Sequence, residues 1–283
     1  MKKIIVAVDF SESSINAFVH ALSIAQKTLS DLILVWVEKP VSERDKFINK
    51  SETPVREVKD QFIEMIGKYQ PELSSNKISY KIRTGKVYKE IALEAKENKA
   101  MLVVAGTHGA SGFEEFWIGS NATRIISACH CAVITIHAGI DIKRPLSKIV
   151  FPIDSSPDTR QKTTFTGYLA KEHDALICIL SLYSSHLKTI RQNVDLYAKQ
   201  VSLYFDEEGI RYQMEGMETD NLSNACIEYA KKNEANLISI MTEQESNTSN
   251  LWMGPYAHQT VNHSPIPVLS IHSKDTLASG TGF

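Results

Sequence analysis

The stretch VVAGTHGASGFEEFWIGSNATRII, residues 103–126, is the most informative part of this 283-residue chain. A short apolar run leads into a segment that contains Gly106, Gly109, Gly112 and Gly119, and a helical pattern begins at Ser120. Glycines allow close approach to the backbone, and a helix start offers unpaired N–H groups and a favourable dipole. The glycine pattern fits neither the P-loop nor the dinucleotide fingerprint. The segment therefore either binds some other anionic ligand or only turns the chain.

The chain contains one sequence pattern twice. The opening KIIVAVDFS, residues 3–11, recurs as KIVFPIDSS, residues 148–156. Residues 100–137 align with residues 235–272 without a gap, each ending in a histidine, and the second copy is shorter in its middle. Internal repetition of this kind indicates two homologous units. We predict domains over residues 1–140 and 146–273, followed by a polar tail over residues 274–283 that we expect to be disordered.

Each copy alternates strand-like and helix-like segments. In the first copy, residues 4–8 and 32–37 are continuous apolar runs rich in β-branched residues, as is typical of parallel strands buried on both faces. The remaining pattern predicts helices over residues 11–29, 54–68, 87–98 and 120–128, and strands over residues 77–83, 101–105 and 132–136. This order predicts an α/β fold of two tandem repeats, each an open five-stranded parallel sheet flanked by helices.

Composition argues against several classes of partner. The chain is 43% hydrophobic and 23% charged, with a net charge of -2 and no block of five like charges, so no basic surface for nucleic acid or anionic membrane is indicated. The apolar run at the N-terminus is interrupted by Asp9 and Glu12 and has no small-residue cleavage site. We therefore expect a soluble, cytoplasmic protein that binds neither nucleic acid nor membrane.

The four cysteines, Cys129, Cys131, Cys178 and Cys226, lack the paired spacing of a disulfide framework or a zinc knuckle. The sequence Cys129-His130-Cys131 has zinc-ligand types, but neighbouring residues of a strand point to opposite faces, and no second ligand pair is nearby. We predict that the cysteines are structural thiols.

The segment Gly106-x-x-Gly109, nine further residues and then Gly119-Ser120 resembles the nucleotide-binding motif of the universal stress protein family. The first strand with Asp9 after it and the closing run AVITI are similar to that family too. The resemblance covers both repeats and implies a tandem member. It also implies a Rossmann-like fold of the type found in adenine nucleotide alpha hydrolases.

The resemblance implies a site for ATP, or for AMP or ADP, in the first repeat. Asp9 would lie beside the adenosine, and the backbone at Val37 would contact the adenine edge. The phosphates would be held at the end of the fourth strand and at the following helix start, with Mg²⁺ bridging phosphate oxygens rather than bound by assigned side chains. Asp9 has a second interpretation, as the N-cap of the first helix. The implied site residues are Ala7, Val8, Asp9, Val37, Ala105, Gly106, His108, Gly109, Gly119, Ser120, Asn121 and Ala122.

The second repeat departs from this motif. Met241 and Gln244 replace Gly106 and Gly109, and Pro255 opens the following helix, where it removes a backbone N–H. We therefore expect that the second domain does not bind ATP in the manner of the family. The contrast also favours a ligand-related role for the glycines of the first repeat, because the second repeat folds without them.

Three functions are compatible with these residues. The resemblance implies an ATP-binding stress-response regulator with a protein partner, whose domains pair through their last strands, residues 133–136 and 268–271, as an internal pseudo-dimer. Pairing of two whole chains as a homodimer is also compatible. Slow ATP hydrolysis or phosphotransfer is a second hypothesis, which the lack of Lys or Arg in the glycine loop weakens. A binding module for a small non-nucleotide ligand is the third.

Overall fold

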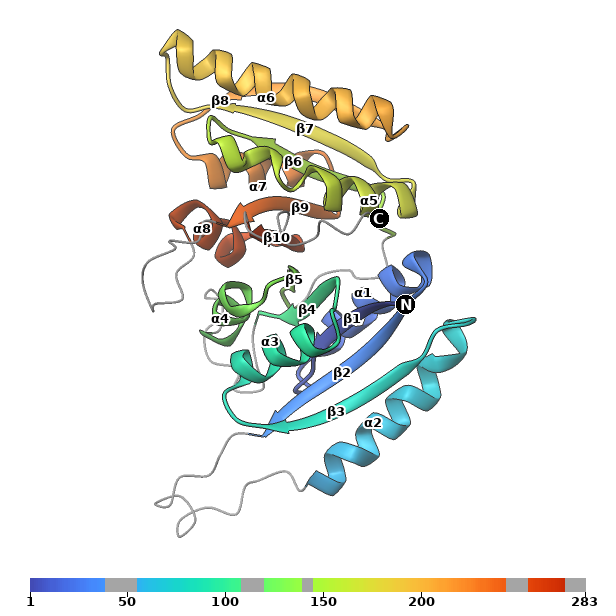
Figure 1. Ribbon diagram of the computed structural model, residues 1–283. Coiled ribbons are helices and arrows are strands. Elements are labelled where there is room, and N and C mark those ends of the chain that lie inside the picture. The colour runs from blue at the N-terminus through green and yellow to red at the C-terminus, as the bar shows by residue number, and fades with distance from the viewer. Residues whose placement is uncertain (39–54, 108–119, 139–144, 243–253, 273–283) are drawn as a thin grey trace, which may run out of the picture.

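The structure is a computed structural model that describes residues 1–38, 55–107, 120–138, 145–242 and 254–272 (Figure 1). The expected tail over residues 274–283 lies outside these residues. The helices and strands of the first repeat begin and end within two residues of the expected ranges. They are β1 (Lys2–Ala7), α1 (Glu12–Thr28), β2 (Ser30–Glu38), α2 (Val55–Tyr69), the 3-10 helix η2 (Gln70–Glu72), β3 (Ile78–Thr84), α3 (Val87–Glu97), β4 (Leu102–Gly106), α4 (Ser120–Ala128) and β5 (Ala132–Ile136).

The second repeat has the same order of strands and α-helices, but among the described residues it has no counterpart of η2, and it differs at its first helix. A 3-10 turn, η3, precedes that helix, so the helix begins later than α1 does in the first repeat. The second copy is shorter because its second strand and the next helix are joined by residues 184–187, where the first repeat has residues 39–54. The elements are β6 (Lys148–Ile153), η3 (Pro157–Arg160), α5 (Thr163–His173), β7 (Leu176–Tyr183), α6 (Lys188–Glu207), β8 (Tyr212–Glu218), α7 (Leu222–Lys232), β9 (Leu237–Thr242), α8 (Pro255–His263) and β10 (Val268–His272).

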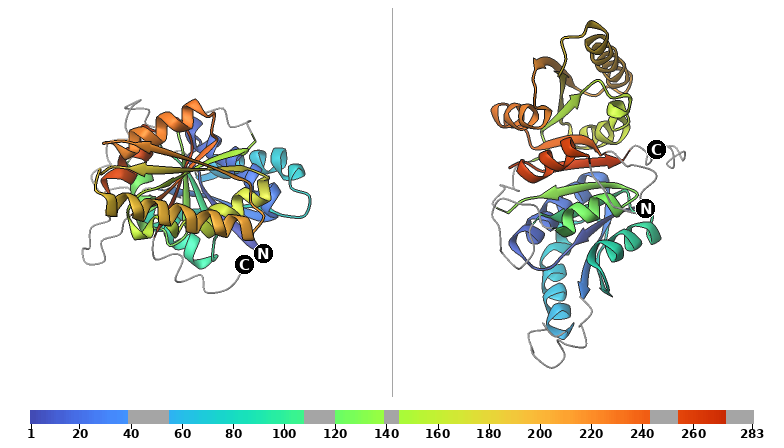
Figure 2. Two further views of the ribbon diagram at one scale, coloured as in Figure 1. Left: turned by 90° about the horizontal axis from the view of Figure 1, so that it is seen from above. Right: turned by 90° about the vertical axis from the view of Figure 1, so that its left-hand side faces the viewer.

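All of these strands join in one sheet, in the order β3-β2-β1-β4-β5-β10-β9-β6-β7-β8. Each repeat contributes five parallel strands, and the two halves meet where β5 and β10 pair antiparallel, with Leu269 opposite Ile134. Figure 2 shows the repeats arranged along one axis with these two strands between them. The α/β prediction and the pairing through the last strands are both confirmed.

Helices cover both faces of the sheet, and this explains the continuous apolar runs. Ile4 and Ile5 of β1 are both fully buried, yet they belong to different core clusters on opposite faces. One cluster packs under α1, α2, α5 and α6, and the other under α3, α4, α7 and α8. Each cluster includes residues of both repeats, so the domains share their core.

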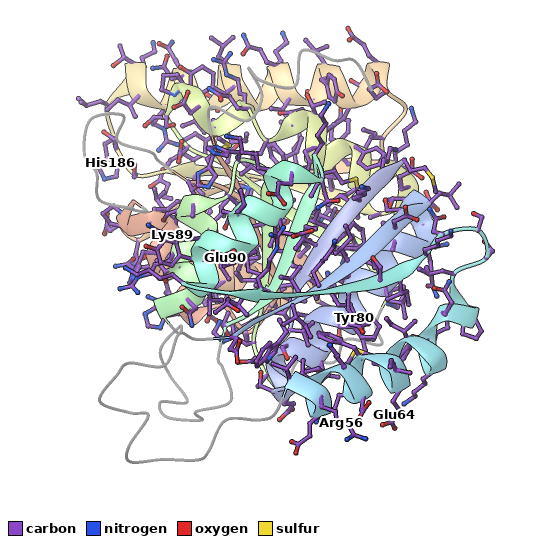
Figure 3. All side chains as sticks on the ribbon, turned by 60° about the horizontal axis from the view of Figure 1, so that its bottom comes forward. Arg56, Glu64, Tyr80, Lys89, Glu90 and His186 are labelled. Carbon is purple, nitrogen blue, oxygen red and sulfur yellow. The ribbon has the colours of Figure 1, made fainter. Side chains whose placement is uncertain are left out.

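Helix α2 shows how an amphipathic helix is anchored at the outer strand. Phe62 is fully buried and stacks on Tyr80 of β3, with ring centroids 5.0 Å apart. Arg56 and Glu64 are exposed and point away from the sheet (Figure 3). Only the inner face of α2 therefore contributes to the core.

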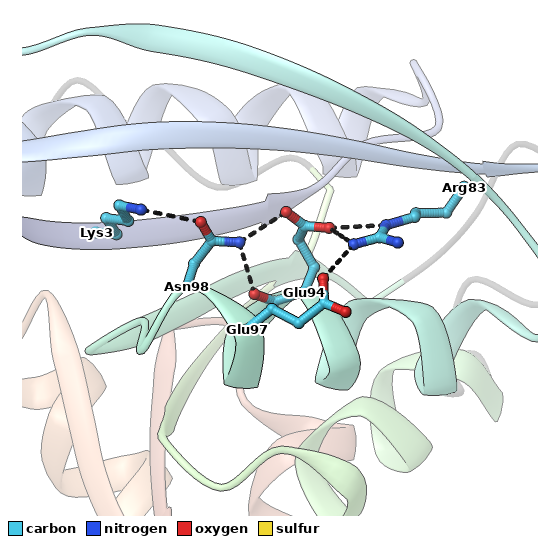
Figure 4. A network of polar contacts seen from close by, with 5 residues as sticks. All are labelled: Lys3, Arg83, Glu94, Glu97 and Asn98. Atoms are coloured by element: carbon cyan, nitrogen blue, oxygen red, sulfur yellow. Dashed lines mark hydrogen bonds and ion pairs between the residues drawn. The ribbon is translucent and has the colours of Figure 1, made fainter.

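Helix α3 is held to β1 and β3 by a polar network (Figure 4). Glu94 is 1% exposed, and its carboxylate accepts hydrogen bonds from Arg83 and from Asn98 Nδ2, the latter at 2.7 Å. Arg83 also donates to Glu97, and Lys3 Nζ donates to Asn98 Oδ1 at 3.0 Å. The buried carboxylate is thus fully paired, as a buried charge requires, and hydrogen bonding to Glu94 raises the pKa of Arg83.

Two histidines at equivalent positions of the repeats bind across the junction. His137, after β5, donates from Nε2 to the carbonyl of Val261 in α8 at 3.0 Å. His272, in β10, donates in the same way to the carbonyl of Ile126 in α4. Both carbonyls lie in the last turn of their helix, where no intrahelical donor follows. The two contacts are related by pseudo-two-fold symmetry, which explains why both copies end in histidine.

A second pair of histidines lies where α1 of the first repeat packs against α5 of the second. The buried Nε2 atoms of His20 and His173 have no hydrogen-bond partner among the described residues. Burial lowers the pKa of both rings to about 4, with repulsion from His173 as a further cause for His20 and from Lys27 for His173. Both rings are therefore neutral at pH 7.

This pair predicts that the free energy of unfolding falls as the pH drops from 7 to 5. The unfolded histidines titrate near 6.5 and the folded ones near 4, so stability that is fully present above pH 6.5 is lost progressively towards pH 4. The loss at pH 5 is about 2 kcal/mol for each histidine. Urea unfolding at pH 7 and pH 5 should show a smaller loss of unfolding free energy for the double variant His20→Gln, His173→Gln than for the wild type. Equal losses in variant and wild type would contradict the assignment.

Candidate functional site

The strand order reverses between β1 and β4 of the first repeat. The chain passes from β1 outward to β2 and β3, whereas β4 and β5 lie on the other side of β1. Ligands of open parallel sheets bind beyond the carboxyl ends of the strands at such a reversal. Ala7 ends β1 directly beside Ala105 of β4, so Asp9 and Gly106 both lie at this edge of the sheet.

Asp9 is not the N-cap of α1, so that interpretation is wrong. The cap is Ser11, whose hydroxyl accepts the N–H of Ser14 at 3.3 Å. Asp9 Oδ1 accepts the backbone N–H of Ser11 at 3.1 Å and also its hydroxyl. The exposed Asp9 carboxylate therefore fixes the cap residue and stands at the sheet edge.

Asp154 makes the same turn in the second repeat. Its Oδ1 accepts the N–H of Ser156 at 2.8 Å. The N–H of Asp154 donates to the hydroxyl of Thr159 at 3.3 Å, as the N–H of Asp9 does to Ser14. The aspartate turn is thus common to both repeats and does not depend on a glycine loop.

The residues expected to line the base lie on both faces of the sheet. Ala7 and Val37 are half-buried and pack against the core cluster under α3 and α4. Val8 is 4% exposed, belongs to the opposite cluster, and donates its N–H to the carbonyl of Val35 at 2.9 Å. The structure therefore brings Ala7, Val8 and Asp9 to the same edge, with the side chain of Val8 inside the core.

Packing requires a glycine at position 106, and the sequence did not reveal this requirement. A Cβ atom at this position would lie 2.5 Å from Ser13 Oγ and 2.7 Å from the Ser13 carbonyl carbon. The first turn of α1 packs directly on the backbone of β4, so no side chain fits. The second repeat has Met241 here, and the turn η3 stands where α1 has its first turns.

The remaining implied residues belong to the loop after β4 and to α4. Helix α4 begins at Ser120, Asn121 in its first turn is exposed, and Ala122 is 2% exposed against the core. His108, Gly109 and Gly119 lie outside the described residues, and their assignment stays a prediction.

Cys129, Cys178 and Cys226 are buried and Cys131 is half-buried. Within the described ranges, no group of three or more His, Cys, Asp or Glu is placed to hold a metal ion.

The corresponding edge of the second repeat carries a pocket that the sequence did not suggest. Its volume is about 90 Å³, and Lys162, 1% exposed, lines it. A lysine within a helical pattern is normally expected to face solvent, so the burial of Lys162 becomes apparent only from the structure. The pocket is lined by Pro152, Asp154, Ser156, Asp158, Thr159, Lys162, Ile240, Met241, Thr242, Gly254, Tyr256 and Ala257.

Comparison with known proteins agrees with the geometry. The model of the universal stress protein family matches residues 1–137 and again residues 145–272. The chain belongs to the universal stress protein family. The tandem arrangement implied by the repeats is thus confirmed.

This universal stress protein is similar to members from archaea and bacteria. It is 28% identical over 142 residues to universal stress protein MJ0531 of Methanocaldococcus jannaschii, which covers 48% of this chain and 81% of that protein. A universal stress protein structure from Archaeoglobus fulgidus covers 96% of this chain and 98% of its own, with 15% identity and a TM-score of 0.75. The structure of a putative universal stress protein from Pseudomonas aeruginosa covers 98% of this chain and 95% of its own, with 15% identity and a TM-score of 0.69. Both structures share the fold of the whole tandem chain.

Among the described helices, none is long and apolar enough to cross a membrane.

The contact at Gly106 predicts that Gly106→Ala destabilises the protein. The added methyl group has to displace the first turn of α1, which we expect to cost about 1–3 kcal/mol of the free energy of unfolding. Gly67→Ala is the matched control, because a Cβ at this exposed position in α2 meets nothing within 4 Å. The control should be neutral or stabilising by up to about 1 kcal/mol. Similar urea unfolding curves for both variants would refute the packing argument.

Proposed function

We propose that the first repeat of this universal stress protein binds ATP with Mg²⁺ and that occupancy regulates a protein partner. The observation that carries the proposal is the contrast between the two equivalent sheet edges. At the carboxyl ends of β1 and β4 the first repeat has Ala7, Ala105 and Gly106. The second repeat has Pro152, Ile240 and Met241 at the corresponding positions.

Small side chains allow a ligand to approach the main chain. A nucleotide has to place its base and phosphates against the backbone at a sheet edge of this kind, as glycine-rich nucleotide sites do. The second repeat has larger residues at all three positions, although it keeps the fold and the aspartate turn. The contact with Ser13 already accounts for glycine at position 106, so the support for a ligand comes from Ala7, where the second repeat has Pro152, and from the start of the following helix.

The start of α4 supports a phosphate position. The first N–H groups of a helix have no intrahelical acceptor, and the helix dipole favours negative charge there. Helix α8 of the second repeat begins with Pro255, which has no N–H. Family membership and the motif at Gly106, Gly109, Gly119 and Ser120 support the same assignment.

Regulation fits the residues better than catalysis. Residues 106–120 contain no Lys or Arg to neutralise charge that develops on the γ-phosphate. Mg²⁺ would remain bound through phosphate oxygens and water, since it retains several waters at sites of this type. ATP would act by binding one conformation of the protein better than another, which shifts a surface available to a partner.

Asp9 and Asp154 provide a matched pair of variants that tests the proposal. Both carboxylates fix the same turn, so Asp9→Ala and Asp154→Ala should lose similar free energies of unfolding. Only Asp9→Ala should lose affinity for Mg-ATP, by at least about tenfold, because it removes a charged hydrogen-bond acceptor beside the ligand. Isothermal titration calorimetry gives the affinities. An equal effect of the two variants on ATP affinity would place the site elsewhere.

The purified protein offers a direct measurement. Denaturing it and separating the released small molecules should yield ATP, whereas ADP that accumulates on incubation with ATP would favour hydrolysis. Gly109→Gln copies the residue of the second repeat and should abolish ATP binding while leaving the unfolding curve unchanged. Release of no nucleotide and no calorimetric binding by the wild type would refute the proposal.

A further inference from the structure

The pocket of the second repeat differs in kind from a nucleotide site. Its volume of about 90 Å³ is formed by described residues at the carboxyl ends of β6 and β9. A water molecule needs about 10–15 Å³ of such space, so this pocket suits a ligand of roughly half a dozen heavy atoms rather than a nucleoside triphosphate.

Lys162 places a buried cation in the wall of this pocket. Nζ donates to the carbonyl and the hydroxyl of Thr159 and lies 4.4 Å from the centroid of the Phe151 ring. None of the ion pairs among the described residues involves Lys162. Burial lowers its pKa to about 8, against the opposing effects of Asp154 and Cys226, so the amine is still mainly protonated at pH 7. Buried charges in proteins are normally paired, and Lys162 has the attraction of Asp154, which lines the same pocket, but forms no ion pair among the described residues.

The first turn of α8 adds a second positive feature to the same pocket. The N-cap residue Gly254 supplies no side-chain hydrogen bond, and Tyr256 and Ala257 line the pocket. Pro255 at the helix start has no N–H, but the N–H groups of Tyr256 and Ala257 remain and have no acceptor within the helix. An oxyanion can bind such groups together with an ammonium group.

The carboxylates at the pocket limit what can bind. Asp154 accepts the N–H of Ser156, and Asp158 is exposed and accepts a hydrogen bond from Gln161 Nε2 at 2.5 Å. Two acidic groups disfavour a highly charged ligand such as a triphosphate. They permit a small anion that lies against Lys162 and the start of α8.

The residues that build this pocket are specific to the second repeat. Lys162 aligns with Ala17 of α1, which is fully buried in the core, and Tyr256 aligns with Asn121. The hydroxyl of Tyr256 contacts Cys226 Sγ at 3.2 Å, and Cys226 aligns with Ile91. The second repeat therefore has Lys162 and Cys226 where the first has the buried apolar residues Ala17 and Ile91, and Tyr256 where the first has the exposed Asn121.

We propose that the second repeat binds a small oxyanion, of the size of inorganic phosphate, between Lys162 and the first turn of α8. The site is independent of the ATP site proposed for the first repeat. The anion completes the charge pairing of Lys162 and accepts the N–H groups of Tyr256 and Ala257.

The test uses the full-length protein freed of nucleotide and titrated with inorganic phosphate. Calorimetry should show binding to the wild type. Lys162→Met should weaken it by at least about tenfold, because methionine has a side chain of similar length but no charge. Gly109→Gln should retain phosphate binding, which separates this site from the first repeat. Retained Mg-ATP binding by Lys162→Met would show that the variant is folded.

A measurement on the wild type keeps the test decisive if Lys162→Met does not fold. Backbone NMR signals of Tyr256 and Ala257 should shift on addition of phosphate, and the affinity should fall as the pH rises through 8, where Lys162 loses its proton. No binding at millimolar phosphate, unchanged affinity in Lys162→Met, loss of binding in Gly109→Gln, or signals of Tyr256 and Ala257 that do not move would each overturn the proposal.

Discussion

The antiparallel pairing of β5 and β10 is the interaction on which the rest of the molecule depends. Each repeat alone would leave its last strand as an open edge with unpaired N–H and C=O groups, which is a liability for any sheet. Pairing these two edges satisfies the groups and places both core clusters across the repeats. The strands within each repeat are parallel and the junction is antiparallel. The carboxyl ends of β1 and β4 therefore point in the opposite direction from those of β6 and β9. The two candidate ligand sites therefore face away from each other.

This arrangement allows the residues at the carboxyl ends of the strands to differ between the two repeats. The junction is formed by the last strands, whereas both candidate sites lie at the carboxyl ends of other strands and in the turns that follow them. The second repeat differs from the first in Met241, in Lys162 and in the turn η3, while the strand order is equivalent in both. Gly106 and Asp9 serve both stability and ligand binding at the proposed ATP site, because Gly106 packs against the first turn of α1 and Asp9 fixes its cap residue.

The sequence predicted the fold because its strongest signals report burial. Strands buried on both faces appear as continuous apolar runs, and Ile4 and Ile5 are buried as that pattern requires. The site was predicted less completely because its details depend on tertiary contacts. The need for glycine at position 106 comes from the approach of Ser13, and the burial of Lys162 comes from Phe151 and Thr159. Neither contact leaves a periodic signal. Asp9 had two interpretations from sequence, and only the geometry of Ser11 excluded the cap.

The paired histidines at the junction connect the two sites in a specific way. His272 binds the last turn of α4, whose first turn lies at the edge proposed for ATP, and His137 binds the last turn of α8, whose first turn lines the second pocket. Each helix thus has one end at a ligand site and the other held by the opposite repeat. Burial lowers the pKa of His272, so its ring is neutral and donates from Nε2 while Nδ1 accepts the hydroxyl of Thr242. A ligand that moved either helix along its axis would have to strain or break the histidine contact at the junction. The two hydrogen bonds therefore hold α4 of the first repeat and α8 of the second to the opposite repeat.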